Sequence, residues 1–213
     1  DPAMEGDNQA DVTRIINHLR LNHDEHRLTM NLALIRKVPD IIRQGEFNIT
    51  ATIVRPVRRD GKNEIVNVEP GDTTSRNFGI AVDIGTTTVY GMLIDLHTGD
   101  VPAQYGNFNS QISYGEDVIS RIIFAEKGDG LQTLHEKVVD TINSIIEKIL
   151  TRAGVDKNEV TTITLAGNST MTQMLLNINP TYIRKDPYVP ASMMYPPFHA
   201  TDIGLSLADH SIA

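Results

Sequence analysis

The sequence predicts an α/β fold with a mixed sheet, preceded by a small unit that makes the chain α+β overall. Short apolar runs at residues 78–84 and 89–94 flank a turn of one glycine and three threonines, which is typical of two buried strands joined tightly. Farther along, apolar residues recur every three or four positions over residues 131–153, which indicates a long helix laid on a sheet. Residues 160–166, VTTITLA, are rich in β-branched residues and predict a further strand.

Composition limits the class of protein and its partners. The 213 residues allow one or two domains, and a hydrophobic content of 40% is enough for a real core. A net charge of −8 argues against a nucleic-acid backbone or an anionic membrane as partner. No signal peptide or membrane-spanning apolar stretch is visible, so we expect a cytoplasmic protein. The chain has no cysteine and therefore no cysteine-ligated iron–sulfur or zinc site of its own.

The predicted small unit covers residues 1–75, and its polar first ten residues are expected to be frayed. Four elements are expected in chain order: a helix over 11–22, a helix over about 24–36, and hairpin strands over 47–54 and 64–69 joined by a turn at 59–62. Asp11 is expected to cap the first helix, Pro39 to interrupt the second, and Gly45 to close the short segment after it. Residues 70–75 are the predicted linker.

The turn between the first two strands of the larger unit has the composition of a phosphate site. Asp83 ends the first strand, and Gly85, Thr86, Thr87 and Thr88 follow it. Gly85 has no Cβ, so the backbone can bend sharply and a ligand can approach closely. Backbone N–H groups and threonine hydroxyls donate to phosphate oxygens, and a carboxylate such as Asp83 holds Mg²⁺ together with those phosphates. A β-hairpin without a ligand is the alternative.

Five further elements are expected after this turn, in chain order: a strand over 101–108, a helix that begins at residue 118, the long helix over 131–153, a strand over 160–166 and a short helix over 171–176. Four apolar residues of the first helix are expected on its core face: Val118, Ile119, Ile122 and Ile123. Gly167, Asn168 and Ser169 precede the short helix, where they form either an anion site or a helix cap, and both interpretations stay open. Five prolines within eighteen residues after residue 177 indicate a loop-rich segment.

Three separated segments resemble the reductive activators of corrinoid proteins, which are ferredoxin-linked ATPases: NFGIAVDIGTTTVYGMLIDLHTGD, QISYGEDVISRI and LAGNSTMTQMLLNINP. The order of elements, with a phosphate turn between the first two strands, also resembles the first subdomain of the actin-like ATPase superfamily, which has a ribonuclease H-like fold. The helix–hairpin unit at residues 1–75 resembles the family's middle domain. The resemblance thus implies a middle domain, followed over 76–213 by the first half of an ATPase domain with a loop-rich C-terminal part.

The resemblance implies a function for the full-length protein, namely the ATP-dependent reduction of an inactive Co(II) corrinoid protein to the Co(I) state. ATP and Mg²⁺ are the implied ligands, and a 2Fe-2S cluster in an upstream domain is the implied electron carrier. A corrinoid protein is the expected partner, for example a corrinoid iron–sulfur protein or a methyltransferase component, and a homodimer is a further expectation. The chain contains neither the cluster domain nor the second ATPase subdomain, so we expect a fragment that binds nucleotide weakly and is inactive alone.

The family motifs also imply roles for individual residues. Residues expected to contact phosphate and Mg²⁺ are Asp83, Gly85, Thr86, Thr87 and Thr88, and residues expected at the cleft wall are Gly167, Asn168 and Ser169. The resemblance alone marks five more residues as belonging to the cleft, without a chemical role: Gln111, Tyr114, Gly115, Glu116 and Asp117. No residue is assigned to catalysis.

Two other functions stay open on the sequence. A small-molecule kinase of the same fold needs a carboxylate base near the acceptor hydroxyl, for which Glu116 or Asp117 is a candidate. A non-enzymatic interaction module gated by nucleotide is the other. A phosphorylated product would indicate the kinase, whereas filament formation or peptide binding that depends on nucleotide would indicate the module.

Overall fold

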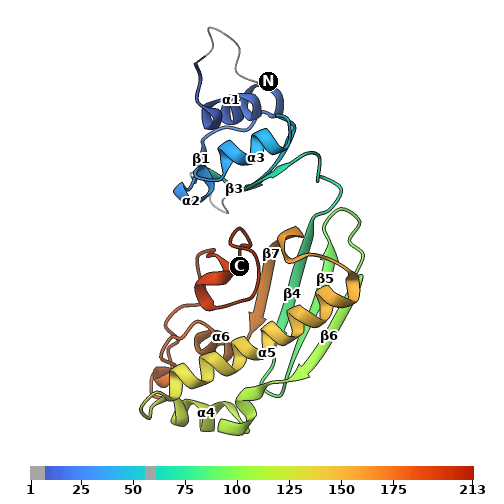
Figure 1. The fold of residues 1–213 in the computed structure, drawn as a ribbon. Coiled ribbons are helices and arrows are strands. Elements are labelled where there is room, and N and C mark those ends of the chain that lie inside the picture. The colour runs from blue at the N-terminus through green and yellow to red at the C-terminus, as the bar shows by residue number, and fades with distance from the viewer. Residues whose placement is uncertain (1–7, 56–60) are drawn as a thin grey trace. The chain divides into compact units, whose positions relative to one another are not determined.

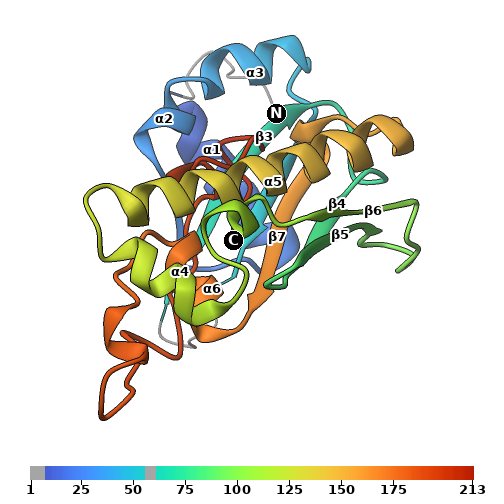
Figure 2. The same cartoon turned by 90° about the horizontal axis from the view of Figure 1, so that it is seen from below.

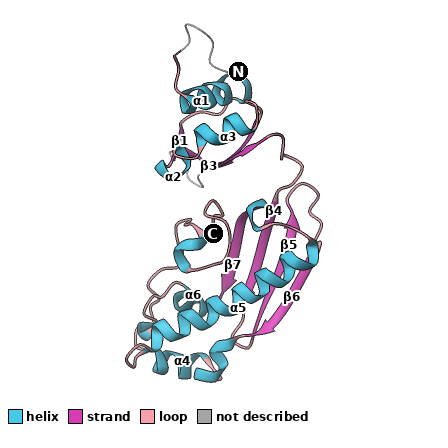
Figure 3. Cartoon of the chain, viewed as in Figure 1, coloured by secondary structure: helices cyan, strands magenta, loops and turns pink. Residues whose placement is uncertain are grey.

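The computed structural model describes residues 8–55 and 61–213 (Figure 1). Contacts within the chain divide it into two compact units, Asp1–Arg76 and Asn77–Ala213, which we call the N-terminal and C-terminal units. Each contains its own helices and its own sheet (Figure 3). Most of the residues expected to be frayed at the N-terminus and half of the turn expected at 59–62 lie outside the described residues.

The N-terminal unit packs helices on a three-stranded sheet. Its elements are α1 (Asp11–His23), β1 (Leu28–Met30), α2 (Leu32–Ile35), α3 (Val38–Gln44), β2 (Ile49–Val54) and β3 (Asn63–Pro70). The strand order is β1-β3-β2, in which β2 runs antiparallel and β1 parallel to β3. The antiparallel hairpin is confirmed, whereas the parallel edge strand β1 was not anticipated.

The long second helix predicted over residues 24–36 is wrong. Asp24 and Arg27 both have φ of 56°, in the left-handed region, so the chain leaves α1 and turns instead of continuing as a helix. Residues 28–30 then pair with β3, and only residues 32–35 are helical. Pairing with a strand more than thirty residues away therefore overrides the helical spacing of the apolar residues.

Two predicted helix ends in this unit also need correction. Ala10, not Asp11, is the N-cap of α1, and the Asp11 carboxylate accepts a hydrogen bond from Arg43 Nη1 at 3.0 Å. Pro39 does not interrupt a helix. It lies in the first turn of α3, where the missing N–H has no partner to lose. Gly45 is the C-cap of α3, as predicted.

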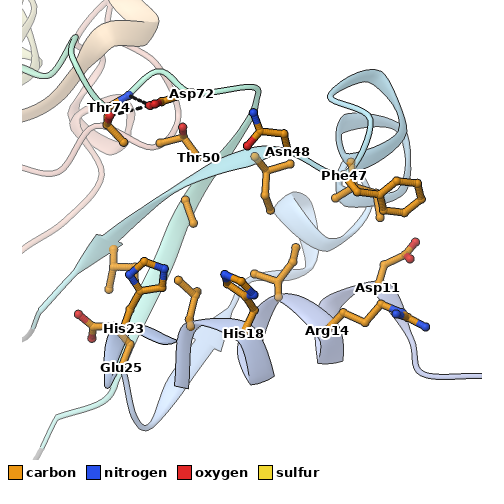
Figure 4. Close-up of a pocket in the computed structure, with 16 residues that line it drawn as sticks. Asp11, Arg14, His18, His23, Glu25, Phe47, Asn48, Thr50, Asp72 and Thr74 are labelled. Atoms are coloured by element: carbon orange, nitrogen blue, oxygen red, sulfur yellow. Dashed lines mark hydrogen bonds between the residues drawn. The ribbon is translucent and has the colours of Figure 1, made fainter. Parts of the chain in front are cut away.

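The core of the N-terminal unit is small and open on one side. Its buried apolar residues are Ile15, Leu34, Val38, Ile42, Ile65 and Val68. A groove of about 660 Å³ separates α1 from β2, and His18 and His23 project from α1 into it (Figure 4). Every residue of β2 is half-buried, and four of the six line the groove.

The C-terminal unit has the mixed four-stranded sheet that the sequence predicts. Its elements are β4 (Phe78–Ile84), β5 (Thr88–Asp95), β6 (Ala103–Phe108), the 3-10 helix η1 (Ser110–Tyr114), α4 (Val118–Ala125), α5 (Gly130–Ala153), η2 (Lys157–Glu159), β7 (Val160–Gly167), α6 (Ser169–Leu175), η3 (Thr181–Ile183) and η4 (Ala200–Ile203). The strand order is β6-β5-β4-β7, with β4, β5 and β6 antiparallel in succession and β7 parallel to β4. The α/β class with a mixed sheet is therefore confirmed.

Helix α5 lies across one face of this sheet (Figures 1 and 2). Its buried residues keep the helical spacing from Leu134 through Val138 and Ile142 to Ile149, as the sequence predicts. Against them, the alternate residues of β4 face the core and Val89 and Leu93 of β5 join them. This packing holds in place the end of the sheet where β4 and β7 both terminate, at Ile84 and Gly167. None of the helices among the described residues is both long and apolar enough to cross a membrane.

Helix α4 buries a different face from the one that the sequence predicts. Ile122 is completely buried as expected, but Ile119 is 52% and Ile123 is 40% exposed. Arg121 is completely buried in their place. A charged side chain takes a core position here because backbone and side-chain oxygens surround its guanidinium.

The loop-rich segment after residue 177 has more packing than its proline content indicates. Leu205 and Leu207 lie buried in the core of the C-terminal unit. Ile212 then pairs with the free edge of β7: Ile163 N donates to Ile212 O at 2.8 Å, and Ile212 N donates to Thr161 O at 3.1 Å. The segment thus covers part of one edge of the sheet, beside residues 161–163 of β7.

Candidate functional site

The turn between β4 and β5 is closed by one backbone hydrogen bond. Gly85 N donates to Thr88 O at 3.0 Å. A Cβ at Gly85 would lie 2.5 Å from that same oxygen, so this turn requires glycine. Thr87 and Thr88 are exposed and Thr86 is half-buried. Their three side-chain hydroxyls make no hydrogen bond with any other described residue, which leaves them available to a ligand.

The carbonyl oxygens of this turn are held from beneath. Asn109 supplies two of the three hydrogen bonds, from Nδ2 to Gly85 O at 2.9 Å and from its backbone N to Thr87 O at 2.8 Å. Arg121 Nη2 supplies the third, to Thr86 O at 2.7 Å. Both side chains are completely buried. The three successive carbonyls therefore point into the protein.

The peptide N–H groups must then point the other way. In a trans peptide the N–H of one residue is antiparallel to the carbonyl before it. With the carbonyls of Gly85 and Thr86 fixed inward, the N–H groups of Thr86 and Thr87 face outward. Neither donates to an acceptor among residues 8–55 and 61–213. Consecutive outward N–H groups beside free hydroxyls are a set of donors that suits the oxygens of a phosphate.

Asp83 places a carboxylate next to this turn. Its neighbours Val82 and Ile84 are buried in the core, so the exposed Asp83 projects from the opposite face of the sheet. It lies between Tyr90 of β5 and Ala166 of β7. In the described part of the chain no three His, Cys, Asp or Glu side chains gather at a metal site. A cation at Asp83 would take its other ligands from phosphate and water, which is how Mg²⁺ is commonly held.

The Gly167-Asn168-Ser169 segment lies at the same edge of the sheet. Because β7 is parallel to β4 and Gly167 pairs with Ile84, the two strands end together. Asn168 Oδ1 accepts from Met171 N at 3.0 Å and is the N-cap of α6. The capping interpretation of Asn168 therefore holds, and a contact of this segment with an anion stays a prediction.

The structure corrects the place of Gln111. Its side chain is completely buried, so it does not line an open cleft. Gln111 Nε2 donates to Leu134 O of α5 at 2.8 Å, and Gln111 Oε1 accepts from Arg121 Nη1 at 3.2 Å. It accordingly links the long helix to the arginine under the turn.

The Tyr114–Asp117 turn surrounds the same arginine. Arg121 Nε donates to Gly115 O at 2.8 Å, and the Tyr114 ring packs on Phe124 with centroids 5.0 Å apart. Asp117 is the N-cap of α4 and accepts from Ser120 N at 2.8 Å. That backbone hydrogen bond lowers the pKa of Asp117 below its usual range.

A kinase base at this turn gains no support from these contacts. A carboxylate that already caps a helix and whose pKa is lowered accepts a proton poorly. Glu116, the other candidate, is exposed. Asn109 and Arg121 are the residues at this site that the sequence analysis did not single out.

Comparison with known proteins places this site in a family. The family model described as RACo middle region matches residues 78–213, and the one described as RACo linker region matches residues 1–75. The segment that the sequence analysis compares with the family's middle domain thus carries the linker description.

Two relatives are similar over much of the chain. The corrinoid activation enzyme RamQ of Eubacterium limosum is 35% identical over 129 residues, which is 60% of this chain and 22% of that protein. A solved structure of a reductive activator for corrinoid, iron-sulfur protein is 34% identical, with a TM-score of 0.87 over 100% of this chain and 33% of the other. The chain therefore spans a third or less of the length of these relatives. Since the middle-region model alone covers more than half of the residues, the chain belongs to the RACo family, the reductive activators of corrinoid proteins.

Proposed function

We propose that the C-terminal unit is the phosphate-binding half of an ATP site. The single observation that carries this proposal is the β4–β5 turn, whose carbonyls are fixed inward and whose N–H groups and hydroxyls are left outward. In this proposal Thr86, Thr87 and Thr88 contact the phosphates, and Asp83 holds Mg²⁺ together with them. Gly167, Asn168 and Ser169 border the phosphates from the end of β7.

We further propose that the whole protein couples ATP to the reduction of a corrinoid protein from Co(II) to Co(I). The family membership and the relatives' names support this role. Nucleotide binding shifts a conformational equilibrium only by its differential affinity for the two states, so the ATP half must bind differently before and after reduction. The partner would be a corrinoid protein. A homodimer and a cytoplasmic location remain part of the proposal.

The electron carrier must lie outside this chain. A 2Fe-2S cluster is held by cysteine thiolates, and the chain has no cysteine. The residues present therefore do not fit the cluster, and no electron-transfer step is assigned to them. Their part in the proposed reaction is to bind and orient the nucleotide.

A titration of the chain itself tests the phosphate site. We expect Mg·ATP to shift the amide NMR signals of Thr86 and Thr87, with weak affinity because only half of the site is present. Thr87→Val removes one hydroxyl and should weaken binding severalfold, whereas Thr13→Val, an exposed threonine on α1, should leave it unchanged. Saturable shifts confined to other residues, or none at all, would contradict the proposed site.

The whole-protein role needs the full-length protein. We expect iron and a ferredoxin-like visible spectrum, together with ATP-dependent conversion of a Co(II) corrinoid protein to Co(I), followed by absorbance. Asp83→Asn should slow that conversion while leaving the iron content unchanged. An iron-free full-length protein would contradict the reductive role, without touching the phosphate site.

A further inference from the structure

Arg121 is a buried charge without a carboxylate partner. Its side chain is completely buried, and among the described residues no carboxylate oxygen lies within 4.0 Å of its guanidinium nitrogens. Desolvation lowers the pKa of Arg121, while the Asp117 carboxylate farther away opposes that effect. A guanidinium stays protonated in proteins, so the site keeps a full positive charge at high desolvation cost. The desolvation cost of this buried charge indicates that Arg121 has a role beyond filling the core.

The contacts of Arg121 join the Gly85–Thr88 turn to three neighbouring segments: η1, the turn before α4, and α6. Nη2 donates to Thr86 O at 2.7 Å and Nε to Gly115 O at 2.8 Å. Nη1 donates to Gln111 Oε1 at 3.2 Å and lies 3.5 Å from Met171 Sδ on α6. The planar fork of a guanidinium makes these contacts at once, which the point charge of a lysine does not.

We propose that Arg121, together with Asn109, is a positioning residue that sets the phosphate-binding conformation of the Gly85–Thr88 turn. This inference rests on the proposed function, because it concerns the same phosphate site. Arg121 acts through the turn. By holding the Thr86 carbonyl inward it aims the Thr87 N–H outward, and its charge lies directly behind the place where an anion would bind.

A purely structural role makes a different prediction. If Arg121 only stabilised the fold, a folded variant without it would bind phosphate as well as the unchanged chain. If it positions the turn, binding falls even where the fold is retained. Two variants distinguish the contribution of the Arg121 charge from that of its geometry. Arg121→Lys retains the charge but loses the planar fork, whereas Arg121→Met loses both.

The test uses Mg·pyrophosphate as the probe and amide NMR of the whole chain as the readout. We expect Arg121→Met to weaken binding at least tenfold, and Arg121→Lys to fall between that variant and the unchanged chain. Arg152→Met is the matched control, because Arg152 also donates to a backbone carbonyl, Gln104 O at 3.1 Å, but from the exposed end of α5. A folded Arg121→Met variant that binds as tightly as Arg152→Met would overturn the inference.

A second measurement does not depend on a variant that folds. In the unchanged chain, the Nε–H signal of Arg121 should shift along the same binding curve as the Thr87 amide when Mg·pyrophosphate is added. A turn that responds to the ligand while the Arg121 signal stays fixed would overturn the inference and leave the proposed function intact. If the Thr86 and Thr87 amides of the unchanged chain do not respond at all, the proposed function fails, and the inference fails with it.

Discussion

The two units are stabilised by apolar cores of very different size. Among the described residues, the buried apolar cluster of the C-terminal unit has 24 members, whereas that of the N-terminal unit has 6. The larger core contains a buried arginine and two buried amides beneath a turn. The free energy gained from the surrounding apolar packing offsets the desolvation of these polar groups. The smaller core leaves a groove between α1 and β2. We therefore expect the larger unit to be the more rigid support, which is what a preorganised site requires.

The largest expected effect comes from the same substitution in each core. Ile142→Ala and Ile65→Ala both remove a completely buried side chain, and each should lower the free energy of unfolding of its own unit by about 3 kcal/mol. The smaller N-terminal core has less stability to lose, so Ile65→Ala should leave that unit mostly unfolded.

The tyrosines allow the two units to be followed separately. All six lie between residues 90 and 195, and the chain has no tryptophan, so tyrosine fluorescence reports on the C-terminal unit alone. Far-ultraviolet circular dichroism reports on both. Ile123→Ala, at a 40% exposed position on α4, is the control and should change stability by less than about 0.5 kcal/mol. A fluorescence transition that moves equally in Ile65→Ala and Ile142→Ala would show that the units unfold as one.

Removing a helix cap from either unit should have an effect of intermediate size on stability. Asn168 Oδ1 accepts from Met171 N at 3.0 Å in the C-terminal unit, and Asn31 Oδ1 accepts from Leu34 N at 2.9 Å in the N-terminal unit. Replacing either asparagine by alanine should cost about 1 kcal/mol in urea unfolding. Glycine at the same positions should restore most of the loss. If Asn168→Ala costs nothing while weakening pyrophosphate binding, the residue contacts the ligand and its capping role is minor.

The smallest expected effect is a pH dependence of the stability of each unit. The pKa of Asp117 is lowered chiefly by the Ser120 N–H, and that of Asp72 chiefly by the Thr74 hydroxyl. Their ordinary value is about 3.9, so both carboxylates stabilise the folded state above that pH and lose this contribution as the pH falls through the lower folded-state value.

Asparagine variants separate the two contributions. Asp117→Asn should alter the C-terminal unit and Asp72→Asn the N-terminal unit, and each difference from the unchanged chain should shrink between about pH 7 and about pH 3. Urea midpoints at the two pH values provide the measurement. A difference that stays constant over that interval would show that the carboxylate charge is not what stabilises the fold.

Local patterns predicted the parts of the fold that local interactions determine. The β4–β5 hairpin follows from two short apolar runs around a glycine–threonine turn, α5 follows from three-to-four spacing, and both are confirmed. The helix expected over 24–36 failed because residues 28–30 pair with β3, a partner that no local window contains. The sequence analysis also singled out the residues of the β4–β5 turn, since a strand that ends in an acidic residue before glycine and threonines is a short-range signal; their contact with phosphate stays a prediction.

The support beneath that turn could not be predicted in the same way. Arg121 becomes a core residue only because its acceptors come from the β4–β5 turn, from η1 and from the turn before α4. One signal was present: Val118, Ile122 and Ala125 are spaced so that Arg121 falls on their face of the helix. The exposure of Ile119 and Ile123 follows from that rotation of the buried face.

The pairing of Ile212 with β7 has a practical consequence for shorter versions of this chain. An unpaired strand edge offers its N–H and C=O groups to any other chain and promotes edge-to-edge aggregation. Here Ile212 occupies the first part of that edge, and Ser211 Oγ adds a hydrogen bond to Val160 O at 2.6 Å. A chain cut just before residue 211 would keep its strands but expose this edge. Loss of solubility at high concentration, rather than loss of fold, is the first defect such a truncation should show.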